Sequence, residues 1–513
     1  MTSGVSPALP SKVAGFSMVT LLVLAVGQFL VGLDMSVASV ALPSIGREFN
    51  VGLAPLQWTV MAYMIAGAAL SVPVGALGDA VGRRRIYLIG LVLFGAGSLV
   101  SAMATGTGTL IAGRAIAGAG SAAMATLALA MLTASVAHDM VTRIVGLWTA
   151  VATASSALGP LIGGLLVTAF GWRSVFAINI IPIVGLVLFV LFKFKLKETP
   201  RGGRIDWFGA GLLTAALVLV CTGLSQAESE KFSSPQVWGP VVAGLVVVLI
   251  MVFQQRHSSA PMVPWKLLKA APIPATIILL IVLGMTLSGS MMQQNLLQQN
   301  ILGFSPALAG VVGLGASIFF IGFSPASPFI ADRIGLRVVS FIGLLLAAGG
   351  TLMLAGIKVD TGPWYIAIAF SIMGIGLGLS MPAVSGAAMS STPKDDMGSV
   401  SGVIGLSGQV ASVLGIAVVG SIAAARTLSA WTGLAPQSAQ TDAVQTLVTS
   451  GNVQEVGKQA GAAAAQAASE AFVIGVGETF LIATAGLVIA AFAAFFLMPK
   501  KAEGKVVVPA PSA

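Results

Sequence analysis

Apolar residues fill this chain in long runs that are separated by short polar turns. A run of 18 or more residues with few charges predicts a transmembrane helix, because roughly 20 residues rising 1.5 Å each cover a hydrocarbon core about 30 Å thick. Fourteen such runs are present, at 16–43, 54–77, 86–105, 108–135, 143–170, 174–193, 206–226, 236–255, 272–300, 306–330, 336–357, 363–388, 398–424 and 471–498. The pattern predicts an all-α integral membrane protein with 14 transmembrane helices.

The composition excludes several other classes of protein. Only 8% of the residues are charged and 57% are hydrophobic, whereas about a quarter of a soluble domain is charged. The chain has no GxxxxGK[ST] phosphate-binding loop, and its two histidines, His138 and His257, fall in predicted loops. We therefore expect neither an enzyme nor a metal site.

The basic residues predict the orientation in the membrane. With both termini in the cytoplasm, 19 of the 26 Lys and Arg residues fall in cytoplasmic segments and six in the opposite loops, and Arg114 alone lies within a span. Cytoplasmic loops carry the excess of Lys and Arg. We therefore expect a multi-pass protein of the plasma or inner membrane with both termini inside. The net charge of +9 is dispersed over short loops, so no binding to nucleic acid is expected.

An internal repeat relates two parts of the chain. The segments GALGDAVGRRR (75–85) and SPFIADRIGLR (327–337) each follow a predicted span and place a glycine three residues after an aspartate, followed by arginine. Their aspartates, Asp79 and Asp332, are 253 residues apart, which fits two six-helix units with a helix pair inserted between them. The assignment of the fold depends on recognising such a repeat.

The repeat predicts the organisation of the chain. The expected parts are a cytoplasmic N-terminus (1–15), a six-helix bundle (16–200), two inserted helices (201–260), a second six-helix bundle (261–498) and a cytoplasmic tail (499–513). The second bundle includes an extracytoplasmic loop at 425–470 that is rich in Ala, Gln, Thr and Gly. This loop is either a helical hairpin over the outer mouth or a mobile, solvated segment.

Five motifs resemble those of the fourteen-span drug:proton antiporters of the major facilitator superfamily, a group that contains quaternary-ammonium and multidrug exporters. They are LDMSVASVALPSI (33–45), GALGDAVGRRR (75–85), RAIAGAGSA (114–122), GPLIGG (159–164) and WRSVFAINIIP (172–182). The resemblance covers essentially the whole chain. It implies two bundles in parallel repeat, protons as coupling ion, no cofactor, and a monomer that exports small molecules.

The resemblance also implies roles for individual residues. Arg114 matches an arginine assigned to proton transfer, and a structural role in binding the carbonyls of neighbouring helices is the alternative. Asp79 and Arg83 match a cytoplasmic latch, and the alternative is that Arg83 to Arg85 only hold the loop on the cytoplasmic side. Asp332 occupies the repeated position. In GPLIGG, Gly159, Pro160 and Gly163 favour close packing and a bend where the two bundles meet, and ordinary small-residue packing is the alternative.

Two carboxylates are candidates for proton exchange on physical grounds. Asp34 lies within the first span, and a carboxylate held away from water binds a proton more readily because desolvation disfavours its charged form. Its alternative role is an interhelical hydrogen bond. Glu478 lies near the outer end of the last span, where it is either a second proton site or an interfacial carboxylate.

The chain departs from the multidrug exporters in having few acids within its spans. Met61 stands where the second span of those exporters has an acid, and the tenth and thirteenth spans contain none. This favours neutral, zwitterionic or anionic substrates. We expect six residues to line the substrate pocket: Gln57, Trp58, Met61, Met291, Gln294 and Gln298. The alternative for the three residues of the ninth span is that they lie in the outer interface.

Three functions remain open from the sequence. The first is proton-driven export of many hydrophobic or amphipathic drugs, antiseptics and antibiotics, which would confer antibiotic resistance. The second is export of a single metabolite or antibiotic. The third is a membrane component, such as the inner-membrane part of a tripartite efflux pump with a periplasmic adaptor.

Overall fold

The computed structural model describes residues 18–134, 141–193, 205–226, 234–258, 261, 273–390 and 397–499. Every regular element in these ranges is a helix, which confirms the predicted all-α class. Two predicted cytoplasmic segments lie outside the described residues. They are 1–15 and, apart from its first residue, 499–513.

The helices follow one another with few long connections. The part of the chain before the second bundle contains α1 (Met18–Phe49), α2 (Leu53–Val81), α3 (Arg83–Ala102), α4 (Thr107–Ala134), α5 (Val141–Phe170), α6 (Ser174–Ala177), α7 (Ile180–Phe192), α8 (Trp207–Ser225) and α9 (Pro235–His257). The remainder contains α11 (Ile273–Leu296), the π-helix η3 (Leu297–Ile301), α12 (Pro306–Phe323), α13 (Ala326–Ile334), α14 (Leu336–Ala355), α15 (Pro363–Ser390), α16 (Met397–Leu434), the 3₁₀ turn η5 (Gln437–Ala439), α17 (Asp442–Thr449), α18 (Val453–Ala460) and α19 (Ala462–Leu497).

The number of membrane-spanning helices agrees with the sequence pattern. Thirteen helical segments of the described chain are long and apolar enough to cross a bilayer, and α5, with 30 residues, occupies the remaining predicted span. Three predicted spans are interrupted rather than continuous. The span 174–193 is divided into α6 and α7, 272–300 is α11 continued by η3, and 306–330 is divided into α12 and α13.

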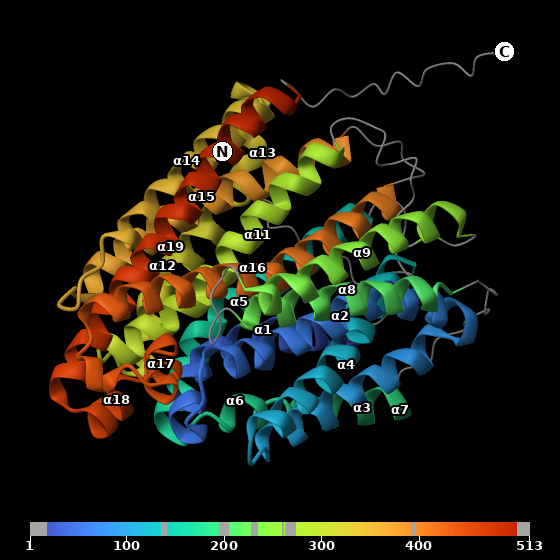
Figure 1. Cartoon of the computed structure of the whole chain (residues 1–513). Coiled ribbons are helices and arrows are strands. Elements are labelled where there is room, and N and C mark those ends of the chain that lie inside the picture. The colour runs from blue at the N-terminus through green and yellow to red at the C-terminus, as the bar shows by residue number, and fades with distance from the viewer. Residues whose placement is uncertain are drawn as a thin grey trace, which may run out of the picture.

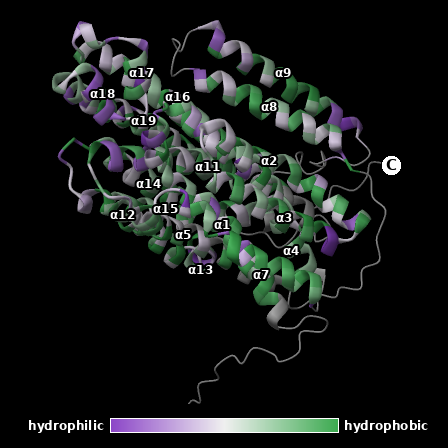
Figure 2. Ribbon diagram, turned by 90° about the horizontal axis from the view of Figure 1, so that it is seen from below, coloured by the Kyte–Doolittle hydropathy of each residue, from purple (hydrophilic) through white to green (hydrophobic). Residues whose placement is uncertain are grey.

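The helices form two bundles that meet along a seam (Figure 1). Helices α1 to α7 pack mainly on one another, and so do α11 to α19. The seam consists of α1, α2 and α5 of the first bundle against α11, α12 and α16 of the second. The inserted helices α8 and α9 pack together at one edge of the molecule, where α8 also contacts α2 and α16 from either bundle (Figure 2).

Close packing through glycine supports the repeat of the two bundles. Gly90 on α3 and Gly343 on α14 are 253 residues apart, as are Asp79 and the aspartate of the second repeat. A Cβ atom at Gly90 would lie 3.1 Å from the carbonyl oxygen of Gly120 on α4, and one at Gly343 would lie 2.8 Å from that of Gly376 on α15. Each bundle thus contains a helix pair whose backbones approach through small residues.

The segment between the last two spans is helical and shorter than predicted. Helix α16 continues to Leu434 and α19 begins at Ala462, because the Ala-rich sequence favours helix beyond the most apolar stretch. Residues 435–461, here called the cap, contain η5, α17 and α18. The cap has its own apolar cluster with the ends of α16 and α19, formed by Trp431, Ala439, Val444, Leu447, Val448, Val456, Ala464, Ala467, Ala468 and Ala471. Of the two alternatives for this loop, the structure therefore shows the helical one and not the solvated segment.

Candidate functional site

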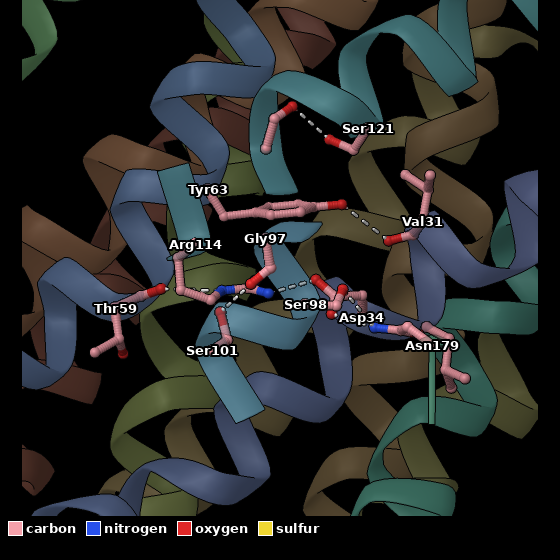
Figure 3. A network of polar contacts seen from close by, with 12 residues as sticks. Val31, Asp34, Thr59, Tyr63, Gly97, Ser98, Ser101, Arg114, Ser121 and Asn179 are labelled. Carbon is pink, nitrogen blue, oxygen red and sulfur yellow. Dashed lines mark hydrogen bonds and ion pairs between the residues drawn. The ribbon is translucent and has the colours of Figure 1, made fainter. Parts of the chain in front are cut away.

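A buried ion pair joins Asp34, halfway along α1, to Arg114 on α4 (Figure 3). Arg114 Nη1 lies 2.5 Å from Asp34 Oδ2, and the two side chains are 1% and 0% exposed. A single charge buried to this degree would cost several kcal/mol, which its partner offsets. Two residues that the sequence singled out separately, 80 positions apart, therefore form one site.

Three further residues complete the surroundings of this pair. Asn179 donates a hydrogen bond from Nδ2 to Asp34 Oδ1 at 2.8 Å. Arg114 Nε donates to the carbonyl oxygen of Thr59 on α2 at 3.2 Å. The guanidinium group also lies 4.3 Å from the centre of the Tyr63 ring, which stabilises a cation through its π face. The site therefore holds Asp34 as a carboxylate with Arg114 as its counter-charge.

Asn179 reaches the site because the helix is broken there. Helix α6 ends at Ala177 and α7 begins at Ile180, so Asn179 lies in the turn between them, fully buried. Pro182 has no backbone N–H to donate to the carbonyl of Ile178, which explains why the helix is interrupted at this point. Sequence reasoning quoted Asn179 within a motif but assigned it no role.

Part of the hydrogen-bonding capacity of the site is unused. Among the described residues, Arg114 Nη2 and Asn179 Oδ1 have no hydrogen-bond partner although both atoms are buried. One donor and one acceptor therefore remain beside the ion pair. Buried water molecules in proteins typically bind to polar groups of this kind that otherwise have no partner.

Asp79 and Arg83, the residues that match a cytoplasmic latch, form an ion pair across the turn between α2 and α3. Arg83 Nε lies 2.7 Å from Asp79 Oδ1, and Arg83 Nη1 donates to the carbonyl oxygen of Ala130 on α4 at 3.1 Å. Gly82 turns the chain with a φ of 117°, which a residue with a side chain rarely adopts. This loop is thus tied to the end of α4.

The corresponding loop of the second bundle is built differently. Asp332 is exposed and lines a cavity of about 280 Å³ between α13 and α15. It forms no ion pair within the described part of the chain. Arg337 instead donates to the carbonyl oxygen of Met498 at 2.9 Å. The repeated aspartates therefore differ in their surroundings.

The glycines of GPLIGG bring α5 against α1. A Cβ atom at Gly159 would overlap the side chain of Ser36, and one at Gly163 would lie 3.2 Å from Val37 Cα. Both contacts lie within two or three residues of Asp34. The packing of α5 therefore determines how closely α1 is held at the buried ion pair.

The same motif also holds α5 against α12 of the second bundle. A Cβ atom at Gly164 would overlap the carbonyl of Pro306, and one at Gly310 on α12 would overlap the carbonyl of Pro160. Only glycine permits backbones to approach so closely. GPLIGG thus lies at the seam, as the sequence predicted.

The predicted substrate residues lie on α2, α11 and η3. Gln57, Gln294 and Gln298 are 2%, 1% and 3% exposed, and Met61 is fully buried. Trp58 and Met291 are partly exposed. A role of these residues in binding substrate stays a prediction. Sequence reasoning missed the adjacent Gln293, which is equally buried, because it considered only the two glutamines spaced four apart.

Glu478 lies on α19 in the second bundle and is not part of the Asp34 site. Its carboxylate is 3.4 Å from Arg426 Nη1 on α16, and the two side chains are 46% and 53% exposed. The structure therefore does not bring the two candidate carboxylates together. A role of Glu478 in proton exchange stays a prediction.

Hydrogen bonds join the two bundles at the end of the molecule that carries the cap. Arg47 on α1 donates to Asn300 Oδ1 of η3 at 2.6 Å, and Gln299 donates to the carbonyl oxygen of Val40 at 3.0 Å. Asn300 also donates to the carbonyl oxygen of Ser450 in the cap at 3.2 Å. The π-helix η3 thus links the first bundle, the second bundle and the cap, and this end of the seam is closed.

Two helical bundles with many apolar helices and a buried ion pair inside the first bundle define a multi-pass membrane protein. The family model described as the Major Facilitator Superfamily matches residues 24–416. The chain belongs to this superfamily, whose members are transporters and not enzymes.

Curated relatives extend the comparison. The chain is 30% identical over 410 residues to the multidrug resistance protein Stp of Mycobacterium tuberculosis, covering 80% of this chain and 76% of that protein. It is 28% identical over 427 residues to the tetracenomycin C resistance and export protein of Streptomyces glaucescens (83% and 79%). It is 35% identical over 345 residues to the cephamycin export protein CmcT of Amycolatopsis lactamdurans (65% and 68%).

Solved structures share the fold. A bacterial homologue of the human lysosomal transporter Spinster, in an inward-facing and unoccupied conformation, superposes with a TM-score of 0.69 at 15% identity, covering 93% of this chain and 96% of that one. A D-xylose–proton symporter gives a TM-score of 0.61 at 15% identity, with 95% and 99% covered. The predicted major facilitator architecture is confirmed.

Proposed function

We propose that this protein exports small hydrophobic or amphipathic compounds in exchange for protons, by alternating access between its two bundles. The names of its relatives, which include multidrug resistance and antibiotic export proteins, support export as the direction of transport. The observation that carries proton exchange is the fully buried pair of Asp34 and Arg114 inside the first bundle. Protons are the coupling ion, and no cofactor is needed.

The chemistry of this ion pair couples proton binding to a movement of the helices. In the structure Asp34 pairs with Arg114 and accepts a hydrogen bond from Asn179. A proton on Asp34 removes the negative charge and leaves the Arg114 guanidinium without a counter-charge. Loss of one partner of a buried pair costs about 3–5 kcal/mol. This cost favours a rearrangement of α1 and α4, in which the unused Arg114 Nη2 and Asn179 Oδ1 acquire partners.

The rearrangement reaches the seam through two elements. Arg114 holds the carbonyl of Thr59 on α2, and Gly159 of α5 packs on Ser36, two residues from Asp34. Both α2 and α5 contact the second bundle. Protonation thus acts on the two helices that lie between the site and the other bundle, while Asp79 and Arg83 latch the opposite end of α2.

We propose that the cap end is extracytoplasmic and that both termini lie in the cytoplasm of a cell whose plasma or inner membrane holds the protein. The excess of Lys and Arg in the opposite loops supports this orientation. The arrangement is then closed to the outside. A monomer suffices for this mechanism, and a periplasmic adaptor stays a prediction.

Replacing Asp34 tests the proposal directly. The variant Asp34→Asn keeps the size of the side chain but cannot exchange a proton, so it should abolish substrate-induced proton release from vesicles and lower drug resistance to that of a pump-deficient host. The matched control Asp442→Asn, at the start of α17 in the cap, should behave as wild type. Equal resistance and equal proton release in Asp34→Asn and wild type would refute the role of Asp34.

Export of a single compound is the second candidate function. It is favoured by the scarcity of membrane-embedded acids, since the described residues of α11, α12 and α16 contain none. Two of the relatives are named for single antibiotics, tetracenomycin C and cephamycin. A panel of unrelated drugs in a pump-deficient host separates the two functions, because a dedicated exporter protects against one compound class only.

A further inference from the structure

Four glutamine amides are buried at the seam, and half of their eight polar atoms have no partner within the described chain. Gln293 and Gln294 on α11 are both 1% exposed, and Gln298 on η3 is 3% exposed. Gln293 Nε2 and Oε1, Gln294 Nε2 and Gln298 Oε1 accept or donate no hydrogen bond there. The hydrogen bond among these three side chains runs from Gln298 to Gln294 at 3.4 Å.

The fourth amide comes from the other bundle. Gln57 on α2 accepts a hydrogen bond from Ser225 of α8 at 3.3 Å. A Cβ atom at Gly420 on α16 would overlap Gln57 Nε2 and would lie 3.6 Å from Gln293 Nε2. The glycine therefore gives room for Gln57 and Gln293 to approach one another across the seam. We call Gln57, Gln293, Gln294 and Gln298 the amide cluster.

An amide without a partner is costly to bury. Each unsatisfied buried donor or acceptor costs about 1–3 kcal/mol, so four such atoms on α11 and η3 destabilise the closed seam. The same elements carry apolar residues, since the fully buried Met61 lies one turn along α2 from Gln57 and the fully buried Leu296 lies two residues after Gln294. An apolar wall with a few converging polar groups is the usual form of a small-molecule site.

We propose that the amide cluster is the polar half of the substrate site and that it selects uncharged compounds carrying both hydrogen-bond donors and acceptors, such as amide, hydroxyl and carbonyl groups. This inference rests on the proposed export function and adds the substrate class. An amide offers one acceptor and two donors without charge. A permanent cation would find no counter-charge here, because Asp34 is already paired with Arg114 and the described residues of α11 and α16 contain no acid.

The cluster also lies next to the proton site along α2. Gln57 lies two residues before Thr59, and Arg114 donates a hydrogen bond to the carbonyl oxygen of Thr59. One turn of α2 therefore carries both a substrate amide and the carbonyl held by the ion pair. Substrate on Gln57 and a proton on Asp34 act on the same turn, which gives a short path for coupling.

Binding of charged and uncharged probes to the purified full-length protein tests this proposal. Chloramphenicol and cycloheximide serve as uncharged probes rich in donors and acceptors, and tetraphenylphosphonium as a cation without any. Equilibrium binding is measured in detergent with no pH gradient, so its outcome does not depend on proton coupling or on the Asp34 experiment. Wild type should bind at least one uncharged probe and should not bind the cation.

Variants of Gln293 then assign the site. Gln293→Met keeps the length of the side chain and removes the amide, and should weaken binding of the uncharged probe about tenfold, as expected for one lost hydrogen bond. Gln293→Glu supplies a charge and should create binding of tetraphenylphosphonium. The control Gln459→Met, on α18 of the cap, should bind as wild type.

Several outcomes would overturn the inference. They are wild-type binding of the cation in preference to the uncharged probes, binding of neither kind, and unchanged affinity in Gln293→Met. Should Gln293→Met fail to fold, Gln294→Met gives the second test with the same expectation. Export without proton release would instead contradict the proposed mechanism of proton exchange. It would not contradict the proposed substrate class.

Discussion

In the proposed mechanism, single residues determine whether the protein can exchange a proton. Asp34 has two oxygens, and different partners hold them: Arg114 contacts one and Asn179 the other. The two contacts together fix the position of the carboxylate between α4 and the turn that follows α6. The sequence identified Asp34 and Arg114 as unusual, because charges within apolar spans are costly. It could not show that they pair, since their contact depends on how α1 packs against α4.

Removing the amide of Asn179 should slow proton-coupled transport. Asn179→Ala takes away the hydrogen bond to Asp34 Oδ1, so Arg114 alone positions the carboxylate. The rate of substrate-induced proton release should fall about tenfold or more, as expected for the loss of a hydrogen bond of about 1.5–3 kcal/mol to a charged group. Ser98→Ala removes only the longer contact of the same amide, at 3.4 Å, and should keep a rate close to that of wild type. A wild-type rate in Asn179→Ala would contradict this positioning role.

Asn179 and Gln293 show why some site residues escaped prediction. An asparagine within an apolar span resembles an ordinary polar residue until the break between α6 and α7 turns it towards Asp34. Gln293 follows a regular helical pattern with its neighbours, and its orphaned amide becomes evident only when α2 and α16 are placed around it. The paired glutamines in MMQQNLLQQN were the one available signal.

At the scale of elements, the contact between α5 and α12 depends on glycine. The carbonyl of Pro160 occupies the space where Gly310 would carry a side chain. Alternating access requires this contact to form in one state and to loosen in the other. The sequence predicted the small residues of α5, while their partner on α12 required the structure.

Enlarging Gly310 should therefore block transport. In Gly310→Leu the new side chain would overlap the backbone of α5, an overpacking that typically costs about 1–3 kcal/mol, and we expect at least a tenfold fall in the transport rate. The control Gly322→Leu lies on the same helix, where a Cβ atom would meet nothing within 4 Å. Rates are compared in vesicles at equal amounts of inserted protein. Full activity in Gly310→Leu would show that the contact is dispensable.

A cross-link across the seam should trap the closed cap end. Thr168 Oγ1 on α5 accepts a hydrogen bond from the backbone N–H of Ala307 on α12 at 3.1 Å. The double variant Thr168→Cys/Ala307→Cys should form a disulfide on oxidation and stop transport, and reduction should restore it. Cys221, the natural cysteine, is buried and should not interfere. Continued transport by cross-linked protein would exclude opening of the cap end as a step.

The whole molecule is where sequence and structure agree best. Fourteen apolar runs, a repeat of 253 residues and an inserted helix pair all have counterparts in the structure, because hydrophobic length and glycine spacing are local properties. Breaks within spans and the continuation of α16 to Leu434 were not foreseen, since helix formation in this chain extends beyond or stops within the most apolar stretches. The cap joins the two bundles through Asn300, a long-range contact that no local pattern specifies.

The central claim is that a proton gradient drives the two bundles through the Asp34 site. The most direct measurement is uptake of labelled substrate into vesicles, with the membrane voltage clamped at zero and the pH difference either imposed or collapsed. Wild type should accumulate substrate against its gradient only when the pH difference is present, and Asp34→Asn should only equilibrate it. Accumulation by wild type with the pH difference collapsed and the voltage nulled would contradict the account.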